Sequence, residues 1–198
     1  TIDNLKQVNL DLGCGNSKKS KDFIGIDIID NDNVDIVGEL IDVLKLFPDN
    51  SVHNIYSNHC FEHLENINTI LKELCRISKK DSIITIIVPH FSNPFYFSDP
   101  THKTLFGLYF FSYFASDNLL RRKVPKYNFN FPLVIESISL NFRSFRPRYI
   151  THFFKKIFGL IFNSSYIAQE FYEENFTGLV SCYEIKFVLR KNNEQQSN

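Results

Sequence analysis

One stretch near the start of the chain decides the fold: Val8-Asn9-Leu10-Asp11-Leu12-Gly13-Cys14-Gly15. Apolar and polar residues alternate over residues 8–12, and the run stops at two glycines, which predicts a buried strand that ends in a tight turn. Because glycine has no Cβ, the backbone of such a turn can approach a ligand closely at the carboxyl end of the strand. The stretch therefore favours an α/β sheet with a ligand crevice at that edge.

The rest of the first half continues this pattern. Short β-branched runs predict strands over residues 23–28, 34–37, 53–57 and 82–88. Apolar residues at helical spacing over residues 64–77 predict an amphipathic helix between the last two strands. The nearly continuous apolar run over 82–88 is typical of a strand covered on both faces. This order predicts a mainly parallel sheet flanked by helices.

The second half has a different character, because only three of the 21 phenylalanines precede Pro89. Helices are predicted over residues 105–114 and 150–162, and strands over 133–142 and 181–189. We interpret residues 91–176 as an aromatic-rich insertion that binds an acceptor or covers it as a lid. Core packing and a dimer surface are the alternatives for these rings. Residues 1–190 are expected to form one domain, and the polar tail over 191–198 is expected to be disordered.

Composition narrows the function classes. The 198 residues contain 22 Lys and Arg against 22 Asp and Glu, so no basic field predicts a nucleic-acid partner. The four cysteines form no C-x-x-C pair, and the sequence shows neither a signal peptide nor a run of about 18 apolar residues. We therefore expect a cytoplasmic protein. The chain begins at Thr1 and contains no Met, which leaves open whether a further N-terminal piece precedes it.

The glycine turn does not fit a dinucleotide site. The dinucleotide pattern needs a third glycine at position 18, which is Lys18, and its acidic residue lies further along the chain than Asp27. Residues 16–22 leave little room for a helix whose first turn would hold a pyrophosphate. An adenosine ligand without pyrophosphate needs instead a carboxylate at the end of the second strand to accept its ribose hydroxyls. Asp27 is predicted there.

These segments resemble the motifs of class I, Rossmann-like methyltransferases that use S-adenosylmethionine. Residues 10–16 are similar to the first motif of that family, residues 25–28 to its acidic second motif, and residues 38–40 to its adenine-contact segment, with Glu for the usual Asp. Residues 57–64 resemble the segment that closes the fourth strand, so the likeness covers about residues 7–90. It implies S-adenosylmethionine as cofactor, held by Asp11, Gly13, Cys14, Gly15, Asn16, Asp27, Ile28, Glu39, Leu40 and Asn58.

Four histidines follow the predicted carboxyl ends of the fourth and fifth strands, and histidine is the commonest general base. Residues 98–103 resemble the D-P-x-H element of bacterial sugar and polysaccharide methyltransferases, which implies an Asp99/His102 pair and O-methylation of a sugar, nucleotide-sugar or surface-polysaccharide precursor. The candidate catalytic residues are thus His102, Asp99, His90 and His63. An Asp-Pro turn that caps a helix is the structural alternative.

The segment His59-x-x-Glu62-His63 matches the inverted zinc-protease signature. It also resembles the Glu-x-x-Glu-His motif of small-RNA 2′-O-methyltransferases and ubiquinone-pathway O-methyltransferases, with His59 replacing the first Glu. That likeness implies a divalent ion held by His59, Glu62 and His63, with His102 or His90 as a further ligand. Alternatively, Glu62 and His63 line the cofactor pocket without an ion. A metal-dependent hydrolase and a non-catalytic partner protein remain as other functions.

The expected partners are small. We predict a small-molecule or glycan-precursor acceptor and no nucleic acid. Residues 153–162 mix aromatic and basic side chains as interfacial helices do, so at most peripheral membrane contact is expected, and a homodimer is left open.

Overall fold

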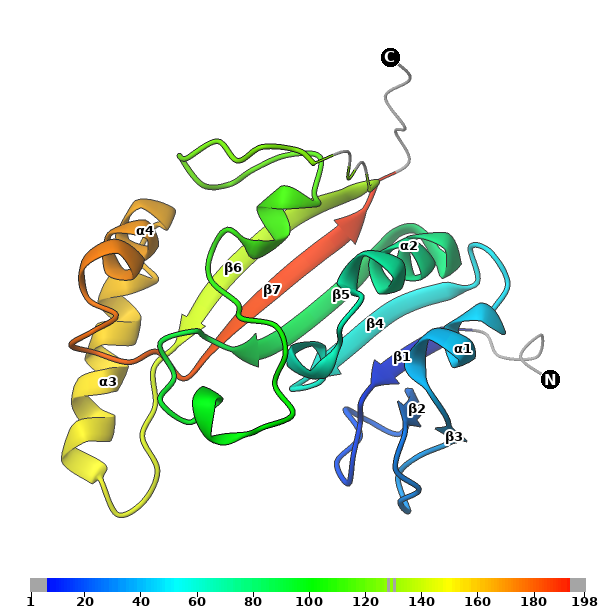
Figure 1. Ribbon diagram of the computed structural model, residues 1–198, viewed down its shortest axis with the longest axis horizontal. Helices are drawn as coiled ribbons and strands as arrows, with labels where there is room; N and C mark the ends of the chain where they lie inside the picture. Colours follow the sequence, from blue (N-terminus) through cyan, green and yellow to red (C-terminus); the bar gives the residue numbers. More distant parts are fainter. Residues whose placement is uncertain (1–6, 128, 130, 193–198) are drawn as a thin grey trace.

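The computed structural model describes residues 7–127, 129 and 131–192, which contain one seven-stranded sheet in the order β3-β2-β1-β4-β5-β7-β6 (Figure 1). The strands are β1 (Val8–Leu12), β2 (Ile24–Asp27), β3 (Ile36–Val37), β4 (Val52–Asn58), β5 (Ser78–Pro89), β6 (Leu133–Asn141) and β7 (Glu184–Lys191). The helices are α1 (Leu40–Lys45), α2 (Ile67–Ile77), α3 (Tyr149–Phe162) and α4 (Tyr166–Asn175), with short 3₁₀ turns η2 (Phe61–His63), η3 (Tyr96–Ser98) and η4 (Phe110–Tyr113).

The direction of the strands places the loops that matter for function. The first five strands pair in parallel, whereas β7 runs antiparallel to both β5 and β6. The carboxyl ends of β1, β2, β4 and β5 therefore share one edge of the sheet with the start of β7. This confirms the predicted Rossmann-like, mainly parallel α/β fold, and ligands bind at this edge in such sheets.

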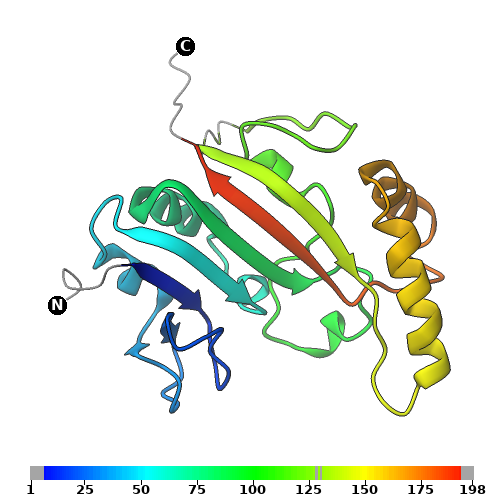
Figure 2. The ribbon, with the colours of Figure 1, turned by 180° about the vertical axis from the view of Figure 1, so that it is seen from behind.

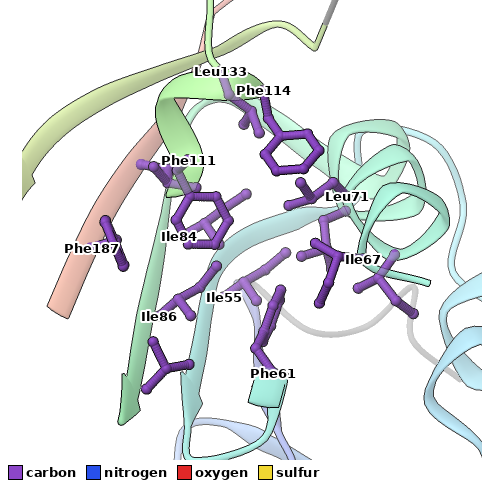
Figure 3. Close-up of a cluster of buried hydrophobic side chains, with 14 of the residues drawn as sticks. Ile55, Phe61, Ile67, Leu71, Ile84, Ile86, Phe111, Phe114, Leu133 and Phe187 are labelled. Atoms are coloured by element: carbon purple, nitrogen blue, oxygen red, sulfur yellow. The ribbon is translucent and has the colours of Figure 1, made fainter. Parts of the chain in front are cut away.

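The hydrophobic core lies on one face of the sheet. There α1, α2 and η4 cover the strands (Figure 1), and Figure 3 shows Ile67 and Leu71 of α2 beside Ile84 and Phe111. Helix α2 forms because its apolar residues recur at intervals of three and four, so they line a single face of the helix. Part of the aromatic-rich region over residues 91–176 completes this core, since Phe106 and Phe111 are fully buried.

The opposite face differs from the prediction for residues 82–88. Seen from behind, no helix of the described chain crosses β1, β4, β5 or β7 (Figure 2). In β5 the residues Ile84 and Ile86 are buried, whereas the residues that alternate with them, Ile83, Thr85 and Ile87, are partly exposed. Although residues 82–88 are almost all apolar, their side chains alternate between a buried face and a half-exposed face, so the strand is not covered on both faces as predicted.

Two helix predictions need correction. Helix α2 begins at Ile67 and not at residue 64, because residues 61–63 form the turn η2 and Leu64 is extended. Within residues 105–114 only the short turn η4 is helical. Tertiary contacts hold the backbone before it, because Phe106 forms a β-bridge with His90 and the amide of Leu108 donates to Glu173.

The carboxyl-terminal elements agree more closely with their predictions, except that α4 was not predicted. Ser165 caps α4 by accepting a hydrogen bond from the amide of Ala168. Lys191, which was assigned to the tail, ends β7 and donates from Nζ to Asn50 and to the carbonyl of Ser78. Residues 193–198 of that tail lie outside the described residues. No helix in the described ranges has both the length and the apolar character needed to cross a membrane.

Candidate active site

The glycine turn after β1 opens the crevice at the carboxyl edge. Gly13 and Gly15 have positive φ angles of 66° and 50°, the left-handed region that glycine enters without steric cost. A Cβ on Gly13 would lie 2.5 Å from Cβ of Cys60, so this glycine allows the strand end to pack closely. A Cβ on Gly15 would meet nothing within 4 Å, so Gly15 faces open space in which a ligand could lie.

Asp27 ends β2 beside this turn. Its Oδ2 accepts the amide hydrogen of Gly15 at 2.8 Å, and its Oδ1 accepts that of Ile29 at 2.9 Å. A carboxylate has about four acceptor positions, so both oxygens can still accept ribose hydroxyls. The pair ties the acidic strand end to the glycine turn, which is the arrangement predicted from the sequence.

Asp11 has a different position from the other predicted cofactor residues. It is buried in β1, where its Oδ2 accepts the amide hydrogen of Lys19 at 2.5 Å. Burial raises the pKa of this carboxyl, although the Lys19 amide opposes the shift. Asp11 therefore holds the loop that follows the glycine turn. Cys14 is also buried, and burial next to Asp11 raises the pKa of its thiol to about 11.

The other predicted cofactor residues lie along the same edge. Asn58 is exposed at the end of β4, Ile28 is exposed after β2, and the side chain of Asn33 donates to the carbonyl of Asn16. Glu39 and Leu40 follow β3 and line a cavity of about 360 Å³. His63 and Lys103 line the same cavity, so it connects the predicted adenine segment with the histidines beyond β4.

Glu62, His63 and His102 form a compact cluster at this edge, with potential ligand atoms all within 4.8 Å of one another. Backbone bonds bring them together, because the carbonyl oxygen of Glu62 accepts hydrogen bonds from the amides of Lys103 and Thr104. Nε2 of His102 lies 4.0 Å from Oε1 of Glu62, beyond hydrogen-bond distance. Only 1% of Glu62 is exposed, and its buried Oε2 has no hydrogen-bond partner in the described chain.

Hydrogen bonds to Nδ1 define the tautomers of the two histidines. Nδ1 of His102 lies 2.8 Å from the carbonyl oxygen of Tyr96, which can only accept, so Nδ1 carries the hydrogen. Nδ1 of His63 lies 2.9 Å from Oγ1 of Thr101, which in turn donates to Asp99 at 2.6 Å. With the Thr101 hydrogen used on Asp99, Nδ1 of His63 donates as well. In the neutral form of each ring, Nε2 is therefore the nitrogen that carries the lone pair.

His59 is not part of this cluster, which corrects the predicted ligand set of His59, Glu62 and His63. Its Nδ1 lies 3.2 Å from Glu62 and its Nε2 lies 3.0 Å from Glu184. Burial lowers the pKa of His59, but the hydrogen bonds to both carboxylates outweigh burial and raise it to about 9. Both ring nitrogens of His59 are thus engaged by carboxylates, so neither is free to bind a metal ion in this arrangement. His102 takes its place beside Glu62.

The contacts of two predicted catalytic residues, His90 and Asp99, differ from those that the prediction requires. His90 is fully buried, with Nδ1 at 2.8 Å from Ser92 and Nε2 at 3.2 Å from Glu173, so it cannot reach an acceptor. Asp99 lies 3.7 Å from Nε2 of His102, which is an ionic contact but no hydrogen bond. Its direct role is to accept from the side chain and amide of Thr101, and these hydrogen bonds lower its pKa. Asp99 therefore positions His63 through Thr101.

Several residues that complete this edge were not predicted from the sequence. Glu184 starts β7 and binds His59 across 125 positions of sequence, a pairing that no local motif can reveal. Thr101 and Tyr96 orient the histidines from the loop after β5. Arg143, Arg146 and Arg148 form a cluster of basic residues in the sequence, which is the signal that could have predicted an anion-binding site here.

Known proteins resemble this chain in the region that contains the glycine turn and Asp27. Residues 10–86 match the protein-family model described as a methyltransferase domain. No curated protein matches the sequence significantly.

Several solved structures share the fold. A SAM-dependent methyltransferase from Archaeoglobus fulgidus has a TM-score of 0.59 at 16% identity, over 93% of this chain and 86% of that one. The YcgJ protein from Bacillus subtilis has a TM-score of 0.56 at 16% identity, over 98% and 96% of the two chains. Phosphoethanolamine N-methyltransferase 2 from Haemonchus contortus, in complex with S-adenosyl-L-methionine, has a TM-score of 0.55 at 12% identity, over 95% and 49%.

The likeness to these structures shows the fold, and the residues matched by the family model include the glycine turn and Asp27. The chain has the class I fold of S-adenosylmethionine-dependent methyltransferases, and its residues 10–86 match the methyltransferase domain.

Proposed function

We propose that this protein is an S-adenosylmethionine-dependent O-methyltransferase that acts on a hydroxyl of a sugar, nucleotide-sugar or surface-polysaccharide precursor. One observation carries the proposal: the open glycine turn and Asp27 share an edge of the sheet with the Glu62–His63–His102 cluster. The first pair suits an adenosyl donor, and the cluster supplies lone pairs for an acceptor proton. The family match supports methyl transfer, so a hydrolase or a non-catalytic protein is not favoured.

The transfer itself is a direct displacement. The acceptor oxygen forms a bond to the methyl carbon as the bond from that carbon to the sulfonium sulfur breaks, which leaves S-adenosylhomocysteine. Alignment of the three atoms supplies most of the rate enhancement for such a step. The acceptor hydroxyl also loses a proton. Nε2 of His102 is placed to take it, because Tyr96 holds the hydrogen of that ring on Nδ1.

The substitution His102→Gln tests the proton-transfer role. Loss of a general base typically costs about 10²–10⁴ in rate, so methyl transfer from labelled donor should fall by at least about 100-fold. Affinity for S-adenosylhomocysteine, measured by calorimetry on the same variant, should remain within about twofold because His102 holds no donor atom in this proposal. Turnover close to that of the unmodified protein would return His102 to a purely structural role.

The cluster also favours a second way to activate the acceptor, namely a divalent ion held by Glu62, His63 and His102. Each of the three residues offers one potential ligand atom within 4.8 Å of the others, and Glu62 also has a buried carboxylate oxygen without a hydrogen-bond partner in the described chain. Two histidines and one carboxylate form the ligand set of many metal sites. Hydrogen bonds to the remaining ring nitrogens orient metal-binding histidines in the same way. A bound ion would lower the pKa of the acceptor hydroxyl. In that case His102 would be a ligand and not the base.

Metal content separates the two possibilities without an activity assay. Protein purified without chelators should contain about one divalent ion per chain if the cluster is a metal site. Glu62→Gln should lose the ion, whereas the matched control Glu65→Gln on the nearby surface should keep it. Absence of metal from the unmodified protein, even after incubation with Mn²⁺ or Zn²⁺, would leave proton transfer to His102 as the remaining route.

A further inference from the structure

A second cavity, of about 540 Å³, lies outside the predicted cofactor site. Its walls come from the loop after β5, the connection from β6 to α3, helix α3 and the segment before β7. Aromatic rings form part of the wall: Phe145 packs edge-on against Phe95 and against Tyr183, with ring centroids 6.2 and 5.2 Å apart. Such rings can pack against a sugar or a base.

The cavity is strongly cationic. Four basic side chains line it, and no aspartate or glutamate does: the basic residues are Arg143, Arg146, Arg148 and Lys155. Only Arg143 approaches a carboxylate, at 3.7 Å from Glu184, and its buried Nε has no hydrogen-bond partner in the described chain. Burial and the charge of Arg148 lower the pKa of Lys155. The other three cations have no carboxylate within ionic contact among the described residues, so an anion in this cavity would offset their positive charge.

Hydrogen-bond donors in the same wall suit a phosphate. Helix α3 has 14 residues and starts beside the cavity, with Thr151 of its first turn among the lining residues. The first amides of a helix lack partners within the helix and attract anions. Arginine guanidinium groups bind phosphate through paired hydrogen bonds, and the hydroxyls of Ser144 and Ser181 also line the cavity.

The cavity adjoins the candidate active site through a short series of contacts. Tyr183 lines the cavity and precedes Glu184, whose carboxylate binds His59, and His59 also binds Glu62 of the histidine cluster. A molecule seated in the cavity could therefore extend towards Nε2 of His102. This position is on the acceptor side, because the glycine turn and Asp27 lie beyond β4 at the other end of the edge.

We propose that this cavity binds the phosphate or diphosphate group of the methyl acceptor. The inference rests on the proposed function and narrows its substrate to an acceptor that carries phosphate. A nucleotide-linked sugar and a lipid-linked sugar share this chemistry. Large apolar side chains of α3 are exposed next to the cavity, among them Tyr149, Ile150 and Phe153, and the experiment therefore includes a lipid arm.

Calorimetric titrations with inorganic pyrophosphate and with uridine diphosphate test the site directly. The double variant Arg146→Gln/Arg148→Gln removes two exposed cations of the cavity, and Lys156→Gln is the matched control, since Lys156 is exposed on α3 but does not line the cavity. In a third arm, co-sedimentation compares vesicles of phosphatidylglycerol with vesicles of phosphatidylcholine. Raising the salt concentration should weaken binding of each anion.

We expect binding of at least one of the three anionic probes, weakened by at least about tenfold in the double variant and unchanged in the control, since each lost charged hydrogen bond has an effect of this size. Uridine diphosphate would indicate a nucleotide-linked acceptor, and phosphatidylglycerol vesicles a lipid-linked one. No binding of any probe, or equal binding by the double variant, would overturn the inference. Titration of the same variants with S-adenosylhomocysteine keeps the two proposals separate, because failure to bind it would count against the proposed function alone.

Discussion

At the scale of single residues, the two glycines of the turn after β1 have different tasks. Gly13 lies against Cys60, where any side chain would collide, whereas Gly15 borders open space. Both have positive φ angles, a backbone conformation that explains a glycine at either position. The Gly-x-Gly pattern in the sequence therefore does not distinguish their roles. The structure thus gives the first glycine a packing role, whereas the second faces open space in which a ligand could lie.

Alanine at each position should separate these tasks. Gly15→Ala should cost only about 1 kcal/mol of stability, the usual penalty of a left-handed alanine, but should weaken binding of S-adenosylhomocysteine by at least about tenfold. Gly13→Ala adds a steric clash to that penalty and should lower the free energy of unfolding by about 3 kcal/mol. Chemical denaturation and calorimetry measure both quantities. Unchanged donor affinity in Gly15→Ala would remove Gly15 from the cofactor site.

The positions of single residues in the fold could be predicted from the sequence where a short motif defines them. The bond between Asp27 and Gly15 joins two motifs only 12 positions apart, and the predicted order of strands already brings them together. His90 and His59 show the limit of this reasoning. Glu173 and Glu184, which hold those two rings, lie 83 and 125 positions away, so only the tertiary structure shows that the histidines are engaged.

At the scale of elements, helix α4 holds the long segment between β5 and β6. Oε2 of Glu173 accepts the amide hydrogen of Leu108 at 2.7 Å and also contacts the buried ring of His90. Glu170, one turn earlier, accepts hydrogen bonds from the amide of Arg121 and the hydroxyl of Tyr109. Two carboxylates of a single helix thus replace the backbone hydrogen bonds that regular structure would give to this segment.

Removal of one carboxylate should therefore destabilise the protein. Glu173→Ala removes the partner of two buried groups, the amide of Leu108 and Nε2 of His90, and should lower the free energy of unfolding by about 3 kcal/mol. Its neighbour Glu174 is exposed on the same helix, so Glu174→Ala should change stability by no more than about 0.5 kcal/mol. Urea denaturation of both variants checks the difference. Equal stabilities would mean that α4 does not hold the segment in place.

The same contacts explain which elements the sequence could predict. The strands and α2 follow periodic apolar patterns that depend on neighbouring residues only, and they lie within a few residues of the predictions. Residues 105–114 have helix-like apolar spacing but are held by His90 and α4, so tertiary contacts override the local pattern.

At the scale of the whole molecule, the order of the sheet defines the site. The strand order places β1 between β2 and β4, so the chain moves outward in opposite directions from β1 and leaves a crevice at the carboxyl ends. The antiparallel strand β7 then brings Glu184 and the cationic cavity to the same edge. The crevice proposed for the methyl donor and the cavity proposed for the acceptor phosphate therefore lie along one edge of the sheet. The sequence predicted the donor half of this arrangement, because its residues follow consecutive parallel strands.

Calorimetric titration with S-adenosylhomocysteine tests the central claim most directly. The unmodified protein should bind one equivalent, and Asp27→Asn should weaken binding by at least about tenfold, because a neutral amide is a poorer partner for two ribose hydroxyls than a carboxylate. Asp30→Asn, an exposed control three residues further on, should bind as the unmodified protein does. Absence of binding to the unmodified protein, or equal affinity of all three proteins, would contradict the adenosyl site on which the account rests.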